Sequence, residues 1–396
     1  MKKLTLIMLG LFVAAGLSVA QSVDTYQADT AHYRVTSEIS KDHAQAVADR
    51  LEALLSLYNT YFHFDLSKLP AKMKVHLFST RDRYDSYLKK VINETRDNYV
   101  YLHYTDAEKS ELDGYYVSGE DLTPAAIHQN FIQYLRAFVA NPPLWLREGF
   151  AVFFESSSYD PTFKTAIFKE NLSWLETLKA IVTGKSPELP LNLDQLLSIN
   201  VDTAKSHISV FYPQSWGMVW YLVNTPDKNR NRILWDSISA LQPGATLEEN
   251  DQAVRKAAFT WVGADALSSD FVAYVDSRKS FRGLVQDGMD QYTANKLDTA
   301  EEAFIKALNL QDSSYVPYYY LGLINYAKHN YQLAEYYYKT ALDKGATKPL
   351  SYYALGVNAY ADNKFDEAQT YLKLVSSLDS GNLKEKAQEL LKRIQS

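Results

Sequence analysis

The C-terminal third of the chain repeats itself with a step of 34 residues, which recurs at Gly288, Gly322 and Gly356. Self-similarity at a fixed period of this length is typical of repeat architectures, in which each unit packs on its neighbours. The other positions that keep the step are Tyr292, Tyr326 and Tyr360; Leu297, Tyr331 and Phe365; Ala300, Ala334 and Ala368; Phe304, Tyr338 and Leu372; and Ala307, Ala341 and Val375. These positions predict the packing contacts of the repeat rather than a ligand site.

This pattern resembles the tetratricopeptide repeat (TPR). The resemblance implies an all-α TPR solenoid over residues 280–396, with about three repeats of two helices and a capping helix, Leu383 to Ile394. Small residues would stand where the two helices of a repeat cross closely, and the first helices would line a concave groove. Such modules bind proteins or peptides, so the resemblance implies a partner of that kind.

The groove of such a solenoid would present four tyrosines: Tyr319, Tyr326, Tyr353 and Tyr360. A tyrosine ring offers a large apolar area with a polar tip, so a groove lined by tyrosines favours mixed apolar and hydrogen-bonding contacts. Tyrosine is also abundant elsewhere in the chain, and the competing interpretation is that these four side chains only pack. The Lys and Asn positions that clamp a terminal carboxylate in chaperone-binding repeats are not evident.

A second pattern lies in residues 123–155. Thr123 and Pro124 predict the N-cap and first position of a helix. The run Asn141-Pro142-Pro143 then breaks that helix before a second one that carries the stretch LREG, residues 146–149. The segment is therefore a predicted helix pair.

On the first of these helices, His128 and Ile132 are four residues apart and share one face. A zinc-binding helix usually carries H-E-x-x-H at this spacing, with two histidine ligands and a glutamate as the general base. In this chain the motif reads HQNFI. The segment resembles the helix pair of gluzincin metallopeptidases, especially peptidase MA-like domains, whose second helix carries P-x-W-L-x-E-G-x-A. The residues that match are Pro143, Trp145, Leu146, Glu148, Gly149 and Ala151.

The resemblance assigns a role to each position of the motif. His128 stands at the first metal-ligand position and Glu148 at the third, while Gln129 occupies the general-base position and Ile132 the lost ligand position. An isoleucine has no lone pair for zinc, and a glutamine amide cannot accept a proton from metal-bound water as a carboxylate can. We therefore expect no metal cofactor and no catalysis at this motif, and a pseudoenzyme used for binding.

Two other functions stay open at this point. One is an active zinc metallopeptidase, in which His128 and Glu148 are joined by an atypical ligand. Candidates for that ligand are Asn130, Gln133, His103 and His207, and Tyr212 would be a candidate for oxyanion stabilisation. The other is a structural scaffold for cell-envelope assembly.

The residues of the motif also have a purely structural interpretation. A lone histidine on an apolar helix is more often a packed, hydrogen-bonded residue than a metal ligand. Glu148 precedes an apolar run and should be buried, so its carboxylate needs a partner. His128 and Arg147 are the nearest candidates in the sequence.

The fold class predicted for the whole chain is α+β. Residues 21–279 would form the peptidase MA-like domain, a small mixed sheet with a helical lobe, and residues 280–396 the TPR domain. Alternation of apolar residues predicts strands at residues 32–38, 72–78, 98–103 and 114–118, and helical spacing predicts helices at residues 42–62 and 81–91. A later helix should contain Tyr212 to Leu222.

The first residues, 1–20, have the pattern of a secretory signal peptide: two lysines, an apolar run and small residues before Ala20. This predicts a periplasmic or secreted bacterial protein with no membrane span after cleavage. The chain has no cysteine, which excludes a disulfide framework. A net charge of -6 without a basic block argues against nucleic acid as a partner.

Overall fold

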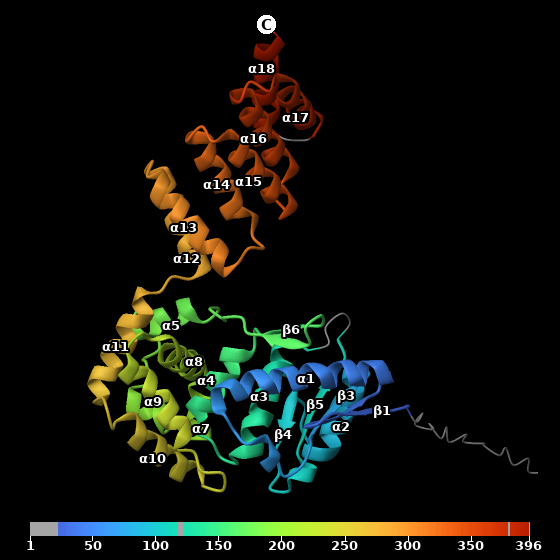
Figure 1. Ribbon diagram of the computed structural model, residues 1–396, viewed down its shortest axis with the longest axis vertical. Coiled ribbons are helices and arrows are strands. Elements are labelled where there is room, and N and C mark those ends of the chain that lie inside the picture. The colour runs from blue at the N-terminus through green and yellow to red at the C-terminus, as the bar shows by residue number, and fades with distance from the viewer. Residues whose placement is uncertain (1–22, 118–121, 379–380, 396) are drawn as a thin grey trace, which may run out of the picture. The chain divides into compact units, whose positions relative to one another are not determined.

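The computed structural model describes residues 23–117, 122–378 and 381–395. The predicted signal peptide lies outside these residues. The fold is α+β, as the sequence predicts: a small mixed sheet comes first and helices follow (Figure 1). The chain divides into two compact units. One comprises the chain up to Pro142 with residues 150–170 and 241–250, and the other comprises residues 143–149, 171–240 and the chain from Asp251 onward.

The first unit is built on a five-stranded sheet with the order β1-β2-β3-β5-β4. The β2–β3 and β3–β5 pairs are parallel, whereas β1 and β4 pair antiparallel at the two edges. The strands are β1 (Tyr26–Asp29), β2 (Tyr33–Ser37), β3 (Met73–Phe78), β4 (Val100–Leu102) and β5 (Glu111–Tyr115). Two 3₁₀ turns accompany them, η1 (Leu66–Lys68) and η2 (Ala107–Lys109).

Helices cover both faces of this sheet. On one face lie α1 (Lys41–Phe62), which connects β2 to β3, and α3 (Pro124–Phe138). The other face carries α2 (Arg81–Ile92), whose Tyr84 and Leu88 form an apolar cluster with residues of β3 and β4. Successive strand residues point to opposite faces of the sheet. The apolar side chains on one of these faces form the core beneath α1 and α3.

The remaining elements up to residue 277 are divided between the two units. α4 (Leu144–Phe154) follows α3, and a hairpin of β6 (Ser158–Asp160) and β7 (Thr165–Ile167) packs on α1. In the second unit, α8 is buried along most of its length and stacks Trp216 on Trp220, with ring centroids 5.1 Å apart. The helices of this part are α5 (Leu175–Val182), α6 (Leu193–Leu197), α7 (Val201–Ser206), α8 (Ile208–Asn224), α9 (Lys228–Ser239), α10 (Leu247–Ala258) and α11 (Ala264–Ser277).

The C-terminal array consists of three helix pairs and a last helix, which follow one another in the stack (Figure 1). In each pair the glycine of the first helix faces the large residue 16 positions later: Gly288 faces Phe304, Gly322 faces Tyr338 and Gly356 faces Leu372. The helices are α12 (Phe281–Thr293), α13 (Leu297–Leu310), α14 (Tyr315–Ala327), α15 (Tyr331–Asp343), α16 (Lys348–Ala361), α17 (Phe365–Ser377) and α18 (Asn382–Gln395). The 34-residue step therefore corresponds to a repeated helix pair.

The turn inside each pair is also repeated. Asn295, His329 and Asn363 have φ values of 57°, 60° and 60°, in the left-handed region. The next residue donates its backbone N–H to a carbonyl five positions back, as in the bond from Lys296 to Gln291. This is the hydrogen bond of a Schellman motif, which ends a helix by satisfying its last carbonyl groups.

Some elements differ from those that the sequence predicts. The strand expected at residues 114–118 begins earlier, at Glu111, and ends at Tyr115. Gly114 does not start the strand: the ring of Tyr99 lies over it, so that a Cβ at this position would be 2.2 Å from the ring. Alternation of apolar residues also does not predict β1 or the β6–β7 hairpin, which are short and partly exposed.

Candidate functional site

The helix pair of the degenerate motif begins as the sequence predicts. The Thr123 side chain accepts a hydrogen bond from the backbone N–H of Ala126 at 3.2 Å, and Pro124 opens α3. On this helix, His128 is largely buried, and its Nδ1 lies 3.3 Å from Oε2 of Glu155. The imidazole thus has a carboxylate neighbour just beyond the end of α4.

Gln129, at the predicted general-base position, has a structural contact. Its Oε1 accepts a hydrogen bond from the backbone N–H of Tyr101 at 3.2 Å. Tyr101 belongs to β4, the edge strand of the sheet, where a backbone N–H group needs a partner from outside the ladder. The glutamine amide therefore ties α3 to the edge of the sheet.

Ile132 is buried, with 7 % of its surface exposed. It shares α3 with Phe131, which enters a cluster of aromatic rings from α1, α3 and α4. The ring of Phe131 lies 5.2 Å from that of Tyr58 and 5.3 Å from that of Phe154. The side chain at position 132 is thus buried and apolar, and it has no lone pair for a metal ion.

Two candidates for an atypical ligand on α3 contribute their side chains to a buried network. The Nδ2 of Asn130 donates to the Tyr33 hydroxyl at 3.0 Å and approaches Oε1 of Gln133 at 3.3 Å. The Nε2 of Gln133 donates to the Lys74 carbonyl at 2.8 Å. These amides attach α3 to β2 and β3.

The other candidates belong to other elements than α3. His103 and Gln133 both line a cavity of about 1150 Å³ in the first unit, and His128 is not among its lining residues. His207 is exposed between α7 and α8, and Tyr212 lies on α8. Both belong to the second unit.

Glu148 lies in the second unit, with 5 % of its surface exposed. Its Oε1 accepts hydrogen bonds from the neighbouring Arg147, at 2.8 Å from Nε and 2.6 Å from Nη2. Arg147, which is one of the two partners considered from the sequence, therefore binds this carboxylate. The next residue, Gly149, passes so close to the Ser215 carbonyl that a Cβ would be 2.5 Å from its oxygen, so only glycine fits there without a shift.

The four tyrosines of the predicted groove are all partly buried, on α14 and α16. Burial raises the pKa of Tyr319 to about 12 and also raises the pKa of Tyr326. Tyr319 and Tyr326 pack against one apolar cluster, which contains Tyr338, whereas Tyr353 packs against the next one, which contains Leu372. Tyr360 packs its ring 5.7 Å from that of Phe365.

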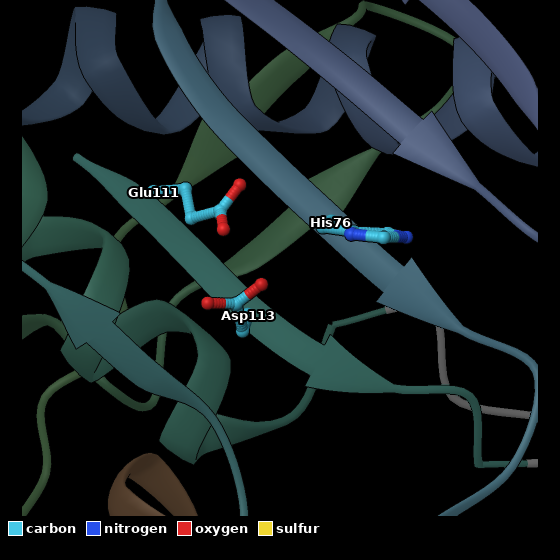
Figure 2. A group of neighbouring side chains, drawn as sticks. All are labelled: His76, Glu111 and Asp113. Carbon is cyan, nitrogen blue, oxygen red and sulfur yellow. The ribbon is translucent and has the colours of Figure 1, made fainter. Parts of the chain in front are cut away.

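A cluster of side chains that could bind a metal was not predicted from the sequence. His76 of β3 and Glu111 and Asp113 of β5 place their ligating atoms within 4.8 Å of one another (Figure 2). Alternation in the stretch KMKVHLF does place His76 on the side of β3 opposite to Val75 and Leu77. The strand predicted from the sequence begins only at Gly114, so the prediction does not place Glu111 and Asp113 on one face of a strand.

Part of this chain is similar to a known protein family. A family model described as "Protein of unknown function (DUF1570)" matches residues 123–242. The matched segment begins at the N-cap of α3 and contains α4, with the Glu148 and Gly149 pair, and the helices up to α9. No curated protein matches the chain. The helix pair thus belongs to the segment that is similar to a family without an assigned function.

Proposed function

We propose that this chain is an exported, catalytically inactive peptidase-like protein, and that its C-terminal array is a TPR module that binds a protein or peptide. The observation that carries the binding function is the group of partly exposed tyrosines on the first helices of successive pairs. Tyr319 and Tyr326 on α14 and Tyr353 on α16 offer ring area and hydroxyl groups to a partner. The 34-residue step and its repeated turn support the TPR assignment.

Loss of catalysis is supported by the contacts of the motif residues. Ile132 is buried, and Gln129 accepts a backbone hydrogen bond. Neither side chain can perform the role that a zinc hydrolase needs at its position. The active metallopeptidase would require both roles to be filled by other groups.

Export is proposed from the N-terminal sequence pattern, with the periplasm or the exterior of a bacterial cell as the destination. Within the described residues, no helix combines the length and the apolar character needed to cross a membrane. Immunodetection in periplasmic and membrane fractions, with N-terminal sequencing of the mature protein, tests this part. Full-length protein in the cytoplasm would contradict it.

The binding function can be tested with peptides selected from a random library against the full chain. We expect Tyr353→Ala to weaken the selected peptides at least about tenfold, the effect of a typical interface anchor. The matched control is Tyr336→Ala, because Tyr336 is 60 % exposed on α15, a second helix of a pair. Equal effects of the two changes, or none, would contradict a role for the tyrosine groove.

Catalysis is tested by incubating the full chain with a denatured protein substrate, with and without a chelator. We expect no hydrolysis in either condition. Hydrolysis that the chelator abolishes, and that Glu148→Ala also removes, would favour the active metallopeptidase instead.

A further inference from the structure

The cluster of His76, Glu111 and Asp113 lies on one face of the central strands of the sheet. β3 and β5 are parallel neighbours, and their register places His76 directly opposite Asp113. Glu111 is two residues before Asp113 and so points to the same face. Figure 2 shows two carboxylates from one strand and the imidazole from the next. Three different ligand groups are thus held by rigid elements.

The burial of Asp113 requires an explanation. Its side chain has no exposed surface, and neither carboxylate oxygen has a hydrogen-bond partner among the described residues. The Nε2 of His76 is likewise buried and without a partner in this part of the chain. Buried carboxylates are normally hydrogen-bonded, paired with a cation or bound to a metal ion.

The neighbouring cations are bound to other groups. Arg83 donates to both oxygens of Glu38 at 2.7 Å. Lys74, on the same face of β3 as His76, lies 3.0 Å from Oε2 of Glu108. The protein thus places two carboxylates beside an imidazole, and it pairs Arg83 and Lys74 with other carboxylates.

Two aromatic residues fix the orientation of the outer members of the cluster. The Tyr87 hydroxyl donates to Oε1 of Glu111, and the ring of His76 stacks on Phe78 with centroids 4.0 Å apart. Hydrogen bonds of this kind orient a carboxylate that binds a metal, and apolar surroundings strengthen its attraction to a cation. His76 and Glu111 are only partly buried, which leaves a path for an ion to enter.

We propose that His76, Glu111 and Asp113 form a binding site for a divalent transition-metal ion, with Zn²⁺ as the preferred probe. One imidazole nitrogen and two carboxylate oxygens suit Zn²⁺, and Mn²⁺ and Fe²⁺, which stand at the weak end of the affinity order, would bind the same set more weakly. Bonds of about 2.0–2.2 Å require tetrahedral ligand atoms about 3.4 Å apart, so the side chains close by roughly 1 Å around the ion. Three protein ligands leave a fourth position for water or a small anion, and the ion links β3 to β5.

The test is calorimetric titration of the full chain with ZnCl₂ after treatment with a chelator. We expect one Zn²⁺ per chain in the wild type. Asp113→Asn should weaken binding by more than about 100-fold, because even partners that only orient a ligand contribute 10- to 100-fold. Asp82→Asn is the matched control: it makes the same change at an exposed carboxylate in the first turn of α2, and it should leave the affinity within about twofold.

A second variant and a structural readout keep the test informative if Asp113→Asn fails to fold. Glu111→Gln should also weaken zinc binding, and zinc should slow amide hydrogen exchange of β3 and β5 in the wild type only. No saturable binding by the wild type would overturn the proposal. Binding that persists unchanged in both variants would place the ion elsewhere and would equally overturn it.

Discussion

Gly322 provides the sharpest test of how the C-terminal array is packed. A Cβ at this position would lie 2.4 Å from Cε1 and 2.5 Å from Cδ1 of Tyr338, whose ring is buried. The Gly322→Ala change therefore forces the ring to move within a full core. Overpacking of this kind costs about 1–3 kcal/mol, whereas replacing glycine by alanine inside a helix gains about 0.5–1 kcal/mol. The expected net destabilisation is about 1–2 kcal/mol.

Amide hydrogen exchange of α14 and α15 in the full chain measures this effect, because it reports the free energy of opening of local segments. A loss of about 1–2 kcal/mol should speed exchange of protected amides by roughly 5- to 30-fold. Gly283→Ala is the control in the same array: a Cβ there would be 3.4 Å from Oγ of Ser280, an ordinary contact. That variant should slow exchange of α12 slightly, by the gain in helix propensity alone.

A double mutant separates the ring contact from other effects. In a Tyr338→Ala background the ring is absent, so Gly322→Ala should no longer destabilise and should gain about 0.5–1 kcal/mol. If Gly322→Ala is neutral or stabilising in the wild-type background, the close approach of α14 and α15 is not the reason for glycine at this position, and the packing account is refuted.

Two further predictions concern the first unit. Burial would raise the pKa of Glu38, but hydrogen bonds led by that from Arg83 lower it to about 2. The contribution of the Glu38 carboxylate to the free energy of unfolding is present above about pH 4.5 and is lost as the pH falls toward 2. The difference in stability between wild type and Glu38→Gln, measured by urea unfolding, should therefore shrink by about 2 kcal/mol between pH 6 and pH 3. An unchanged difference would contradict this. The double change Gln129→Glu and Ile132→His should create zinc binding by calorimetry in an Asp113→Asn background, and failure to bind would count against the peptidase-like origin of α3.

The sequence predicts the repeat and the start of α3 because their signals are local. The 34-residue step can be read directly from the sequence, and Thr123 followed by Pro124 is a common signal for the start of a helix. The repeated turn is less visible. Asparagine often adopts the left-handed conformation, as Asn295 and Asn363 do. The equivalent residue in the middle repeat is His329, so the repeated backbone geometry is not visible from the residue type.

The metal-binding cluster could not be predicted in the same way. His76 and Asp113 are far apart in the sequence, and only the parallel register of β3 and β5 makes them neighbours. The sequence also predicts that the strand begins at Gly114, but this glycine lies inside β5, where its lack of a side chain leaves room for the Tyr99 ring. Register and cross-strand packing are tertiary properties, which periodicity along one strand does not contain.

The contacts of the polar residues of α3 also depend on tertiary structure. Asn130 and Gln133 are spaced so that they share one helix face, and the sequence alone allowed them as ligands. Their bonds to Tyr33 and to the Lys74 carbonyl depend on the sheet beneath the helix. The spacing along a helix shows which side chains share a face, but it does not show which groups they bind.

The zinc content of the purified full chain, compared among wild type, Glu148→Ala and Asp113→Asn, distinguishes the two positions at which a metal ion could bind. We expect that the motif on α3 and α4 binds no metal and that a bound ion belongs to the sheet. We predict that zinc is retained in Glu148→Ala and lost in Asp113→Asn. Zinc that is lost in Glu148→Ala and retained in Asp113→Asn would contradict the account.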